Sequence, residues 1–150
     1  MRVILQRVKE AEVIISEKTE GKIEEGLVIL LGIEEADTQE DIDWLVHKIT
    51  NLRIFSDEKG LMNKSLLDIN GNALIISQFT LHAKTKKGHR PSYIHAAKPE
   101  KAKPLYEKFV KDFNQKIIKE VQTGRFGALM DVSLVNHGPV TIFIDSKKRE

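Results

Sequence analysis

The chain has 150 residues, of which 41% are hydrophobic and 31% are charged, so it can bury a core and is not expected to be disordered. We expect one globular domain over residues 1–150. Cysteine is absent, which excludes disulfides and thiolate zinc sites and favours a cytoplasmic setting. The apolar run 26–33 is too short to cross a bilayer, and the charged residues of the first fifteen argue against a secretory signal, so we expect no membrane association.

The net charge of +2 conceals a local basic segment. Residues 82–99 contain no acidic residue but include Lys84, Lys86, Lys87, Arg90 and Lys98. Gly88 and Pro91 indicate a loop, which could bind phosphates or simply be a solvated lysine-rich loop. Three histidines in the same region, at 82, 89 and 95, match no common zinc spacing, so we predict no metal and no cofactor.

The first half of the chain predicts strands followed by a helix. Residues 2–7, 11–16 and 26–33 are rich in Val, Ile and Leu and are separated by charged or glycine-containing turns. Within 37–52 the apolar residues recur at helical spacing, Asp37 and Glu40 resemble a capping box, and His47 lies off the apolar stripe.

The second half predicts further strands and a second helix. Asn70-Gly71 is a strong hairpin signal between strands in 65–69 and 72–79, after a strand at 53–56. We predict a helix over 103–118 that begins near Pro104, and final strands at 129–135 and 140–145 joined by a turn. This order favours an α+β fold whose antiparallel sheet curls toward a barrel, with two packing helices.

Two polar motifs interrupt the apolar pattern. In an extended strand Gln78 and Thr80 would share one face and Ser77 the other, so the strand could enter a cleft; these groups could equally satisfy neighbouring backbone. No His or Asp is spaced to complete a hydrolase triad. The segment 136–141, NHGPVT, is typical of a hairpin turn, and a Gly-Pro bond is cis in only about one case in twenty.

Together these two segments resemble the D-aminoacyl-tRNA deacylase family, also called D-tyrosyl-tRNA deacylases. SQFTL at 77–81 resembles the family's Ser-Gln-x-Thr motif, and NHGPVT its Asn-x-Gly-Pro-Val-Thr motif. MRVILQRV, DWLVHKITNLRIF, TKKGHRPS and TGRFGALMDVSLVN resemble family segments in the same order, so the likeness covers essentially the whole chain. His137 occupies a variable motif position, and Pro104 stands where relatives more often continue a helix.

The resemblance implies a homodimer that hydrolyses the ester between a D-amino acid and the terminal adenosine of tRNA. A Gly-cisPro element, here Gly138 with Pro139, would reach into the partner's site and exclude L-amino acids. Ser77, Gln78, Phe79 and Thr80 would line the ester. Further expected contacts are Phe126, Met130 and Asn136 for the substrate, and Lys84, Lys86, Lys87 and Arg90 for tRNA phosphates.

The resemblance also implies an RNA-assisted reaction, in which the neighbouring ribose hydroxyl activates water and Thr80 is not acylated. A wall that excludes L side chains by collision would admit glycine, so glycyl-tRNA is an expected substrate. Three alternatives stay open: a small-molecule esterase using Thr80 or Ser77, a noncatalytic RNA-binding module, and a purely structural dimer.

Overall fold

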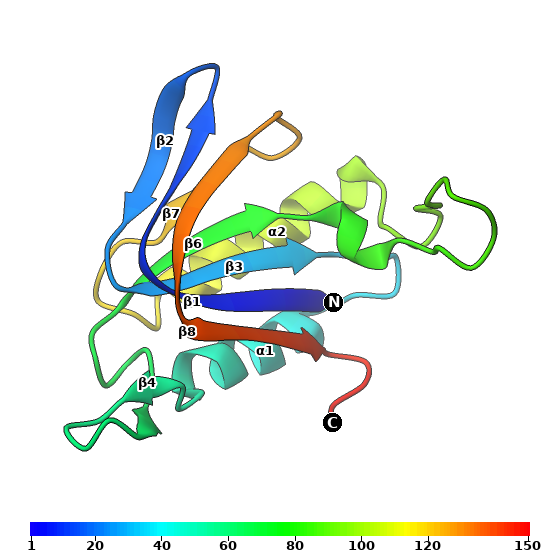
Figure 1. Ribbon diagram of the computed structural model, residues 1–150. Helices are drawn as coiled ribbons and strands as arrows, with labels where there is room; N and C mark the ends of the chain where they lie inside the picture. Colours follow the sequence, from blue (N-terminus) through cyan, green and yellow to red (C-terminus); the bar gives the residue numbers. More distant parts are fainter.

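The computed structural model describes residues 1–150 and combines a curled sheet with two helices that cover one of its faces (Figure 1). The elements in order are β1 (Arg2–Ile15), β2 (Lys18–Ile23), β3 (Gly26–Gly32), α1 (Gln39–Asn51), β4 (Phe55–Ser56), β5 (Met62–Lys64), β6 (Asn72–Ser77), the 3-10 helix η1 (Phe79–His82), α2 (Pro99–Asn114), β7 (Gln122–Thr123) and β8 (Asp131–Asp145).

Strand β1 organises the main sheet. It pairs antiparallel with β8 along almost its whole length, from Arg2 opposite Asp145 to Ile14 opposite Asp131. Its other edge is shared, since residues 2–8 pair with β3 and residues 11–15 pair with β2. Strands β2 and β7 approach so closely that a side chain at Gly21 would meet a carbonyl of β7 at 2.8 Å. The sheet therefore curls into a nearly closed barrel, as predicted.

The sheet is mixed, so the prediction of a purely antiparallel sheet is wrong. β6 lies parallel to both β3 and β7. A parallel pair needs a long crossover connection, and here α1 and the β4–β5 hairpin fill the crossover between β3 and β6. The continuous apolar runs of β3 and β6 fit this arrangement, because both strands are covered on their two faces.

Two hydrophobic clusters hold the layers together. The larger lies between the sheet and the two helices, and its α1 and α2 members include Ile42, Leu45, Val46, Ile49, Phe109 and Phe113. The smaller fills the inside of the curl and contains Val8, Ala11, Val13, Ile23, Val28, Leu74 and Ile76. Because β3 and β6 are buried on both faces, the ends of these two strands hold a fixed position in the fold. The candidate site begins at these ends.

The first and last strands are longer than the sequence pattern predicts. Residues 2–7 and 11–16 fall largely within the single strand β1, and the predicted strands 129–135 and 140–145 merge into the single strand β8. The segment 136–139 is therefore not a hairpin turn. Irregular pairing with β1, between Gln6 and Val8 and between Val8 and Ala11, lets β8 bend there without ending.

The predicted hairpin at Asn70-Gly71 is also wrong. Ser65 donates from its main-chain amide to Asp68 at 2.8 Å, and Asp68 donates from its amide back to the Ser65 hydroxyl at 3.1 Å. These local bonds compete with strand formation and wind residues 65–71 into turns. The hairpin in this region is instead formed by β4 and β5.

The two helices are present, with different ends. α2 spans Pro99–Asn114 rather than 103–118, because Pro99 occupies the first turn and leaves Pro104 inside the helix. α1 is capped at Thr38, whose amide donates to Asp41 at 2.8 Å, and not by Asp37 with Glu40. His47 is exposed, as predicted. Neither helix has the length and apolar character required to span a bilayer.

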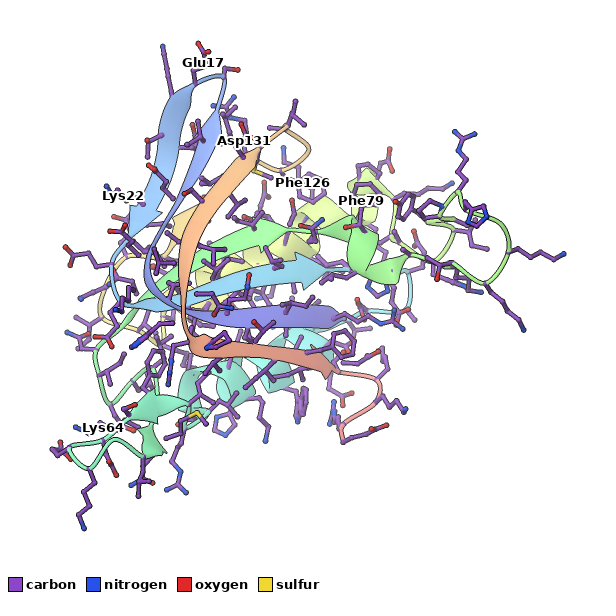
Figure 2. The ribbon with its side chains drawn as sticks, viewed as in Figure 1. Glu17, Lys22, Lys64, Phe79, Phe126 and Asp131 are labelled. Atoms are coloured by element: carbon purple, nitrogen blue, oxygen red, sulfur yellow. The ribbon has the colours of Figure 1, made fainter.

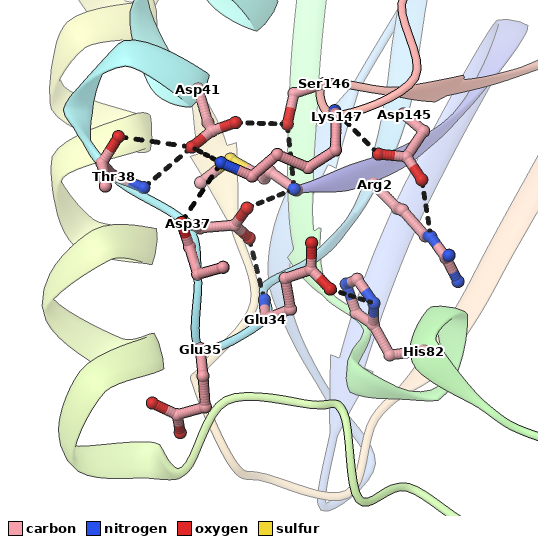
Figure 3. Close-up of polar contacts among 12 residues, drawn as sticks. Arg2, Glu34, Glu35, Asp37, Thr38, Asp41, His82, Asp145, Ser146 and Lys147 are labelled. Carbon is pink, nitrogen blue, oxygen red and sulfur yellow. Dashed lines mark hydrogen bonds and ion pairs between the residues drawn. The ribbon is translucent and has the colours of Figure 1, made fainter.

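A buried ionic network ties both ends of the chain to α1 (Figure 3). The Met1 ammonium contacts Asp37 and donates to the Ser146 hydroxyl at 2.9 Å. Ser146 donates in turn to Asp41 at 2.6 Å, and Lys147 donates to the same carboxylate at 2.8 Å. Burial alone would raise the pKa of Asp41, but these bonds outweigh it and lower the pKa to about 2, whereas burial raises the pKa of Asp37.

Candidate functional site

A cleft of about 590 Å³ opens where β6 ends beside α2 and the segment before β8. Its lining is mostly apolar with a few polar groups, which is typical of a small-molecule or cofactor site. Figure 2 shows Phe79 and Phe126 on this side of the molecule. The cleft brings together five of the residues predicted from the sequence: Ser77, Gln78, Phe79, Phe126 and Met130.

The segment 77–80 changes conformation at the mouth of this cleft. β6 ends at Ser77, and Phe79 begins η1, so Gln78 and Thr80 do not share a strand face as predicted. They nevertheless meet, because the Gln78 carboxamide donates to the Thr80 hydroxyl. The Phe79 side chain is 57% exposed. The segment therefore presents a hydroxyl, a carboxamide and an aromatic ring beside one another.

Aromatic side chains support both walls of the cleft. The Phe79 ring packs edge-on against Tyr93 at a centroid distance of 5.0 Å. On the opposite side Phe126 packs against Tyr106 of α2 at 5.8 Å. The Tyr106 hydroxyl donates to the carbonyl of Ile75 at 2.8 Å, which fixes α2 against β6 two residues before Ser77, and burial raises the pKa of this phenol.

Gly138 and Pro139 lie at the bend of β8 and do not line the cleft of their own chain. Their peptide bond is cis, and both residues are exposed. Gly138 has φ +130°, and a Cβ there would lie 2.8 Å from the Arg7 guanidinium and 2.9 Å from Val140. Glycine is required at this position by both conformation and space.

Arg7 supports this bend from beneath and was missed by the sequence reasoning. Its buried guanidinium donates from Nε to the carbonyl of His137 at 3.0 Å and from Nη1 to the carbonyl of Ile54 at 2.7 Å. The sequence did contain a signal for this role, because Arg7 stands within an apolar strand and a charge buried in such a strand needs hydrogen-bond partners.

Asn136 braces the same bend and lies outside the cleft. The Asn136 carboxamide satisfies all of its neighbours in one orientation. In that orientation the nitrogen donates to the carbonyls of Arg7 and Val140, both at 3.1 Å, and the oxygen accepts from the Thr141 hydroxyl at 3.0 Å. These bonds hold the strand on both sides of the Gly138–Pro139 segment and give Asn136 a supporting position.

The basic loop projects beside the cleft. Lys84 and Ser92 close its base with reciprocal main-chain hydrogen bonds of 2.8 and 3.0 Å. The side chains of Lys84, Lys86, Lys87 and Arg90 are exposed, and none forms an ion pair within the chain. Tyr93, which follows this loop, lines the cleft and was also missed by the sequence reasoning.

No group of three or more potential ligands is arranged to hold a metal ion.

Known proteins resemble this chain in sequence and in fold. A family model described as D-Tyr-tRNA(Tyr) deacylase matches residues 4–145. A D-aminoacyl-tRNA deacylase of Bacteroides fragilis is 61% identical and one of Flavobacterium johnsoniae is 57% identical, each over 150 residues that cover 100% of both chains. The solved structure of a c-Myc DNA unwinding element binding protein is 37% identical, with a TM-score of 0.92 over 97% of this chain and 98% of that one.

The chain belongs to the D-Tyr-tRNA(Tyr) deacylase family. The relatives that it matches over their full length are named D-aminoacyl-tRNA deacylases, so the expectation that this chain is a hydrolase of that kind is confirmed.

Proposed function

We propose that this protein hydrolyses the ester bond of D-aminoacyl-tRNA and releases free tRNA and the D-amino acid, acting in the cytoplasm. The observation that carries the proposal is that Ser77, Gln78 and Phe79 line an apolar cleft, with Thr80 bonded to Gln78, next to an unpaired basic loop. Aminoacyl-tRNA carries an ester at the end of a polyanion, so an enzyme acting on it needs a cleft for the ester and a basic surface for the phosphates. The cleft would take the terminal adenosine between Phe126 and Met130, and the loop would hold phosphates.

The site is proposed to be completed by a second copy of the chain. Gly138 and Pro139 are exposed and lie outside their own cleft, so a twofold dimer is the arrangement in which they could serve a site. Sedimentation should find a dimer at assay concentrations. An active, well-folded monomer would sink this part of the proposal.

Handedness would be selected by exclusion. Recognising many D side chains while refusing L ones requires a rigid wall near the α-carbon, since a side-chain pocket selects size and shape. The Gly138–Pro139 segment is braced by Arg7 and Asn136 and can provide such a wall. Glycyl-tRNA, which has no side chain to collide, should be hydrolysed while L-alanyl-tRNA is spared. Equal resistance of both would contradict a steric wall.

The chemistry is proposed to be RNA-assisted. Thr80 accepts a hydrogen bond from Gln78 and has no histidine or carboxylate bonded to its hydroxyl, so nothing activates it as a nucleophile. The ribose hydroxyl next to the ester would orient or activate water. The Phe79 amide and the Thr80 hydroxyl would stabilise the oxyanion, and one such donor is typically worth about a hundredfold or more in rate.

Single-turnover assays can separate the two mechanisms. Thr80→Ala should slow deacylation without abolishing it, and a substrate lacking the neighbouring ribose hydroxyl should be nearly inert with the intact enzyme. An acyl group trapped on Thr80, together with full activity on the deoxy substrate, would establish covalent catalysis instead.

The function itself is tested with purified protein and D-tyrosyl-tRNA, L-tyrosyl-tRNA and a simple aryl ester. We expect rapid loss of the D-tyrosyl ester only. Turnover of the aryl ester without benefit from tRNA would indicate a small-molecule esterase, and salt-sensitive binding without ester loss would indicate a binding module. Duplex DNA serves as a competitor, since one structural relative is described as a DNA unwinding element binding protein.

A further inference from the structure

His82 is a buried titratable residue that the proposed chemistry does not use. Its side chain is 1% exposed, and neither ring nitrogen makes a hydrogen bond of normal geometry, although the main chain of Gly32 lies close enough to the ring to favour its charged form. The nearest carboxylate is that of Glu34, whose oxygen lies 3.9 Å from Nδ1 (Figure 3). A neutral imidazole carries one donor and one acceptor, so leaving both unpaired in the interior is costly and calls for an explanation.

His82 lies directly beneath the segment that would hold the ester. It is the last residue of η1, two positions after Thr80. η1 packs closely on the end of β3, where a Cβ at Gly32 would lie 2.9 Å from Leu81 and 3.1 Å from the His82 ring. The His82 ring and Leu81 therefore pack against the small residue Gly32, and Thr80 belongs to the same short helix.

Charged groups surround the ring unequally. Arg2 of β1 donates to the carbonyl of Leu81 at 3.0 Å and to Asp145 of β8 at 2.9 Å, so its charge lies close to η1. The Met1 ammonium adds positive charge from the start of the chain, and Glu34 is the one acid that faces the ring directly. Burial, with a smaller contribution from Arg2, lowers the pKa of His82 below its usual 6.5, although the nearby main chain of β3 and Glu34 oppose the shift. The ring is therefore neutral at pH 7.

We propose that His82 is a positioning residue of the deacylation site: its neutral ring seats η1 against Gly32, and a proton draws the ring toward Glu34 and moves Thr80 away from the ester. The same movement would disturb the base of the basic loop, which starts at Lys84. This inference rests on the proposed deacylase function, because that function defines the geometry that His82 maintains.

The kinetic test compares wild type, His82→Leu and the control His95→Leu, which alters an exposed histidine. Single-turnover deacylation of D-tyrosyl-tRNA is measured from about pH 5 to about pH 8, with spontaneous hydrolysis subtracted. Toward the acid end of this range wild type and His95→Leu should lose more rate than His82→Leu, because only the first two carry an imidazole at position 82 that can take up a proton. The comparison isolates His82, because the ester chemistry responds to pH alike in all three proteins. Parallel profiles for wild type and His82→Leu would overturn the proposal.

A second measurement uses wild type alone and needs neither a folded variant nor catalysis. Amide hydrogen exchange in residues 79–84, corrected for the intrinsic pH dependence, should accelerate relative to β3 as the His82 imidazole titrates by NMR. Unchanged relative protection across that titration would also overturn the proposal. If wild type fails to hydrolyse D-tyrosyl-tRNA at any pH, the proposed function is lost, and the exchange data still decide whether His82 seats η1.

Discussion

The guanidinium of Arg7 donates to the carbonyl of His137 at 3.0 Å and so joins the first strand of the chain to the bend of the last. The second bond of this side chain, to the carbonyl of Ile54, extends the link to the segment before β4. One buried side chain thus fixes the position of the Gly138–Pro139 segment against two other parts of the fold.

Replacing Arg7 with methionine should leave both carbonyls without this donor. Hydrogen bonds to charged groups contribute about 1.5–3 kcal/mol each, so losing both should lower the free energy of unfolding by roughly 3–6 kcal/mol in urea titrations. The control Arg53→Met removes an exposed arginine and should change stability little. Equal effects of the two substitutions would contradict a bracing role for Arg7.

Gly138→Ala should reduce both stability and deacylation, because the added Cβ would lie 2.8 Å from the Arg7 guanidinium. Gly60→Ala is the matched control: Gly60 also has positive φ, at +78°, but nothing lies within 4 Å of an added Cβ. We expect Gly60→Ala to lower the free energy of unfolding by about 1–2 kcal/mol from the backbone conformation alone, and Gly138→Ala to lower it by more. Thermal unfolding and single-turnover assays measure the difference, and equal losses at both positions would refute the steric argument.

Neutralising the basic loop should weaken tRNA binding and its dependence on salt. The double substitution Lys86→Ala with Lys87→Ala should lower the slope of log affinity against log salt by about 1.4, at roughly 0.7 per phosphate contact with single-stranded RNA. Lys116→Ala with Lys119→Ala removes the same charge from an exposed segment elsewhere. Filter binding at several salt concentrations would reject the loop as a phosphate site if both pairs behaved alike.

Asp41 should make stability fall in acid. Its folded pKa of about 2 lies below the usual 3.8, so the unfolded chain binds the proton more tightly. Its contribution is therefore complete above about pH 4 and is lost as pH falls toward 2. Asp41→Asn should be less stable at pH 7 and lose less on acidification. Urea unfolding at pH 3 and pH 7 checks this, with the exposed Asp43→Asn expected to follow wild type.

Local sequence signals predicted which helices and strands exist better than they predicted the first and last residues of each. The apolar periodicity of α1 and the runs of β3 and β6 identified those elements, because burial alone sets these patterns. The continuity of β8 was not predictable in the same way, since Gly138 and Pro139 ordinarily end a strand. It depends on pairing with β1, which lies more than a hundred residues earlier.

The candidate site shows the same contrast between residues that local sequence motifs identify and residues that tertiary contacts bring in. The motif residues Ser77, Gln78 and Phe79 were identified from the sequence, and they do line the cleft. Arg7 and Tyr93 were missed because their contributions arise from tertiary contacts: Arg7 meets carbonyls brought from 54 and 137, and Tyr93 meets Phe79 across a loop.

The pairing of β1 with β8 also bears on how the chain is made. The ribosome makes β1 before β8, so β1 waits while more than a hundred residues are added before the partner that covers its edge appears. Contacts this distant in sequence slow folding and leave an unpaired strand edge exposed in the meantime. A polypeptide released before residue 131 would lack β8 and keep that edge of β1 open, so interrupted translation would yield aggregation-prone fragments.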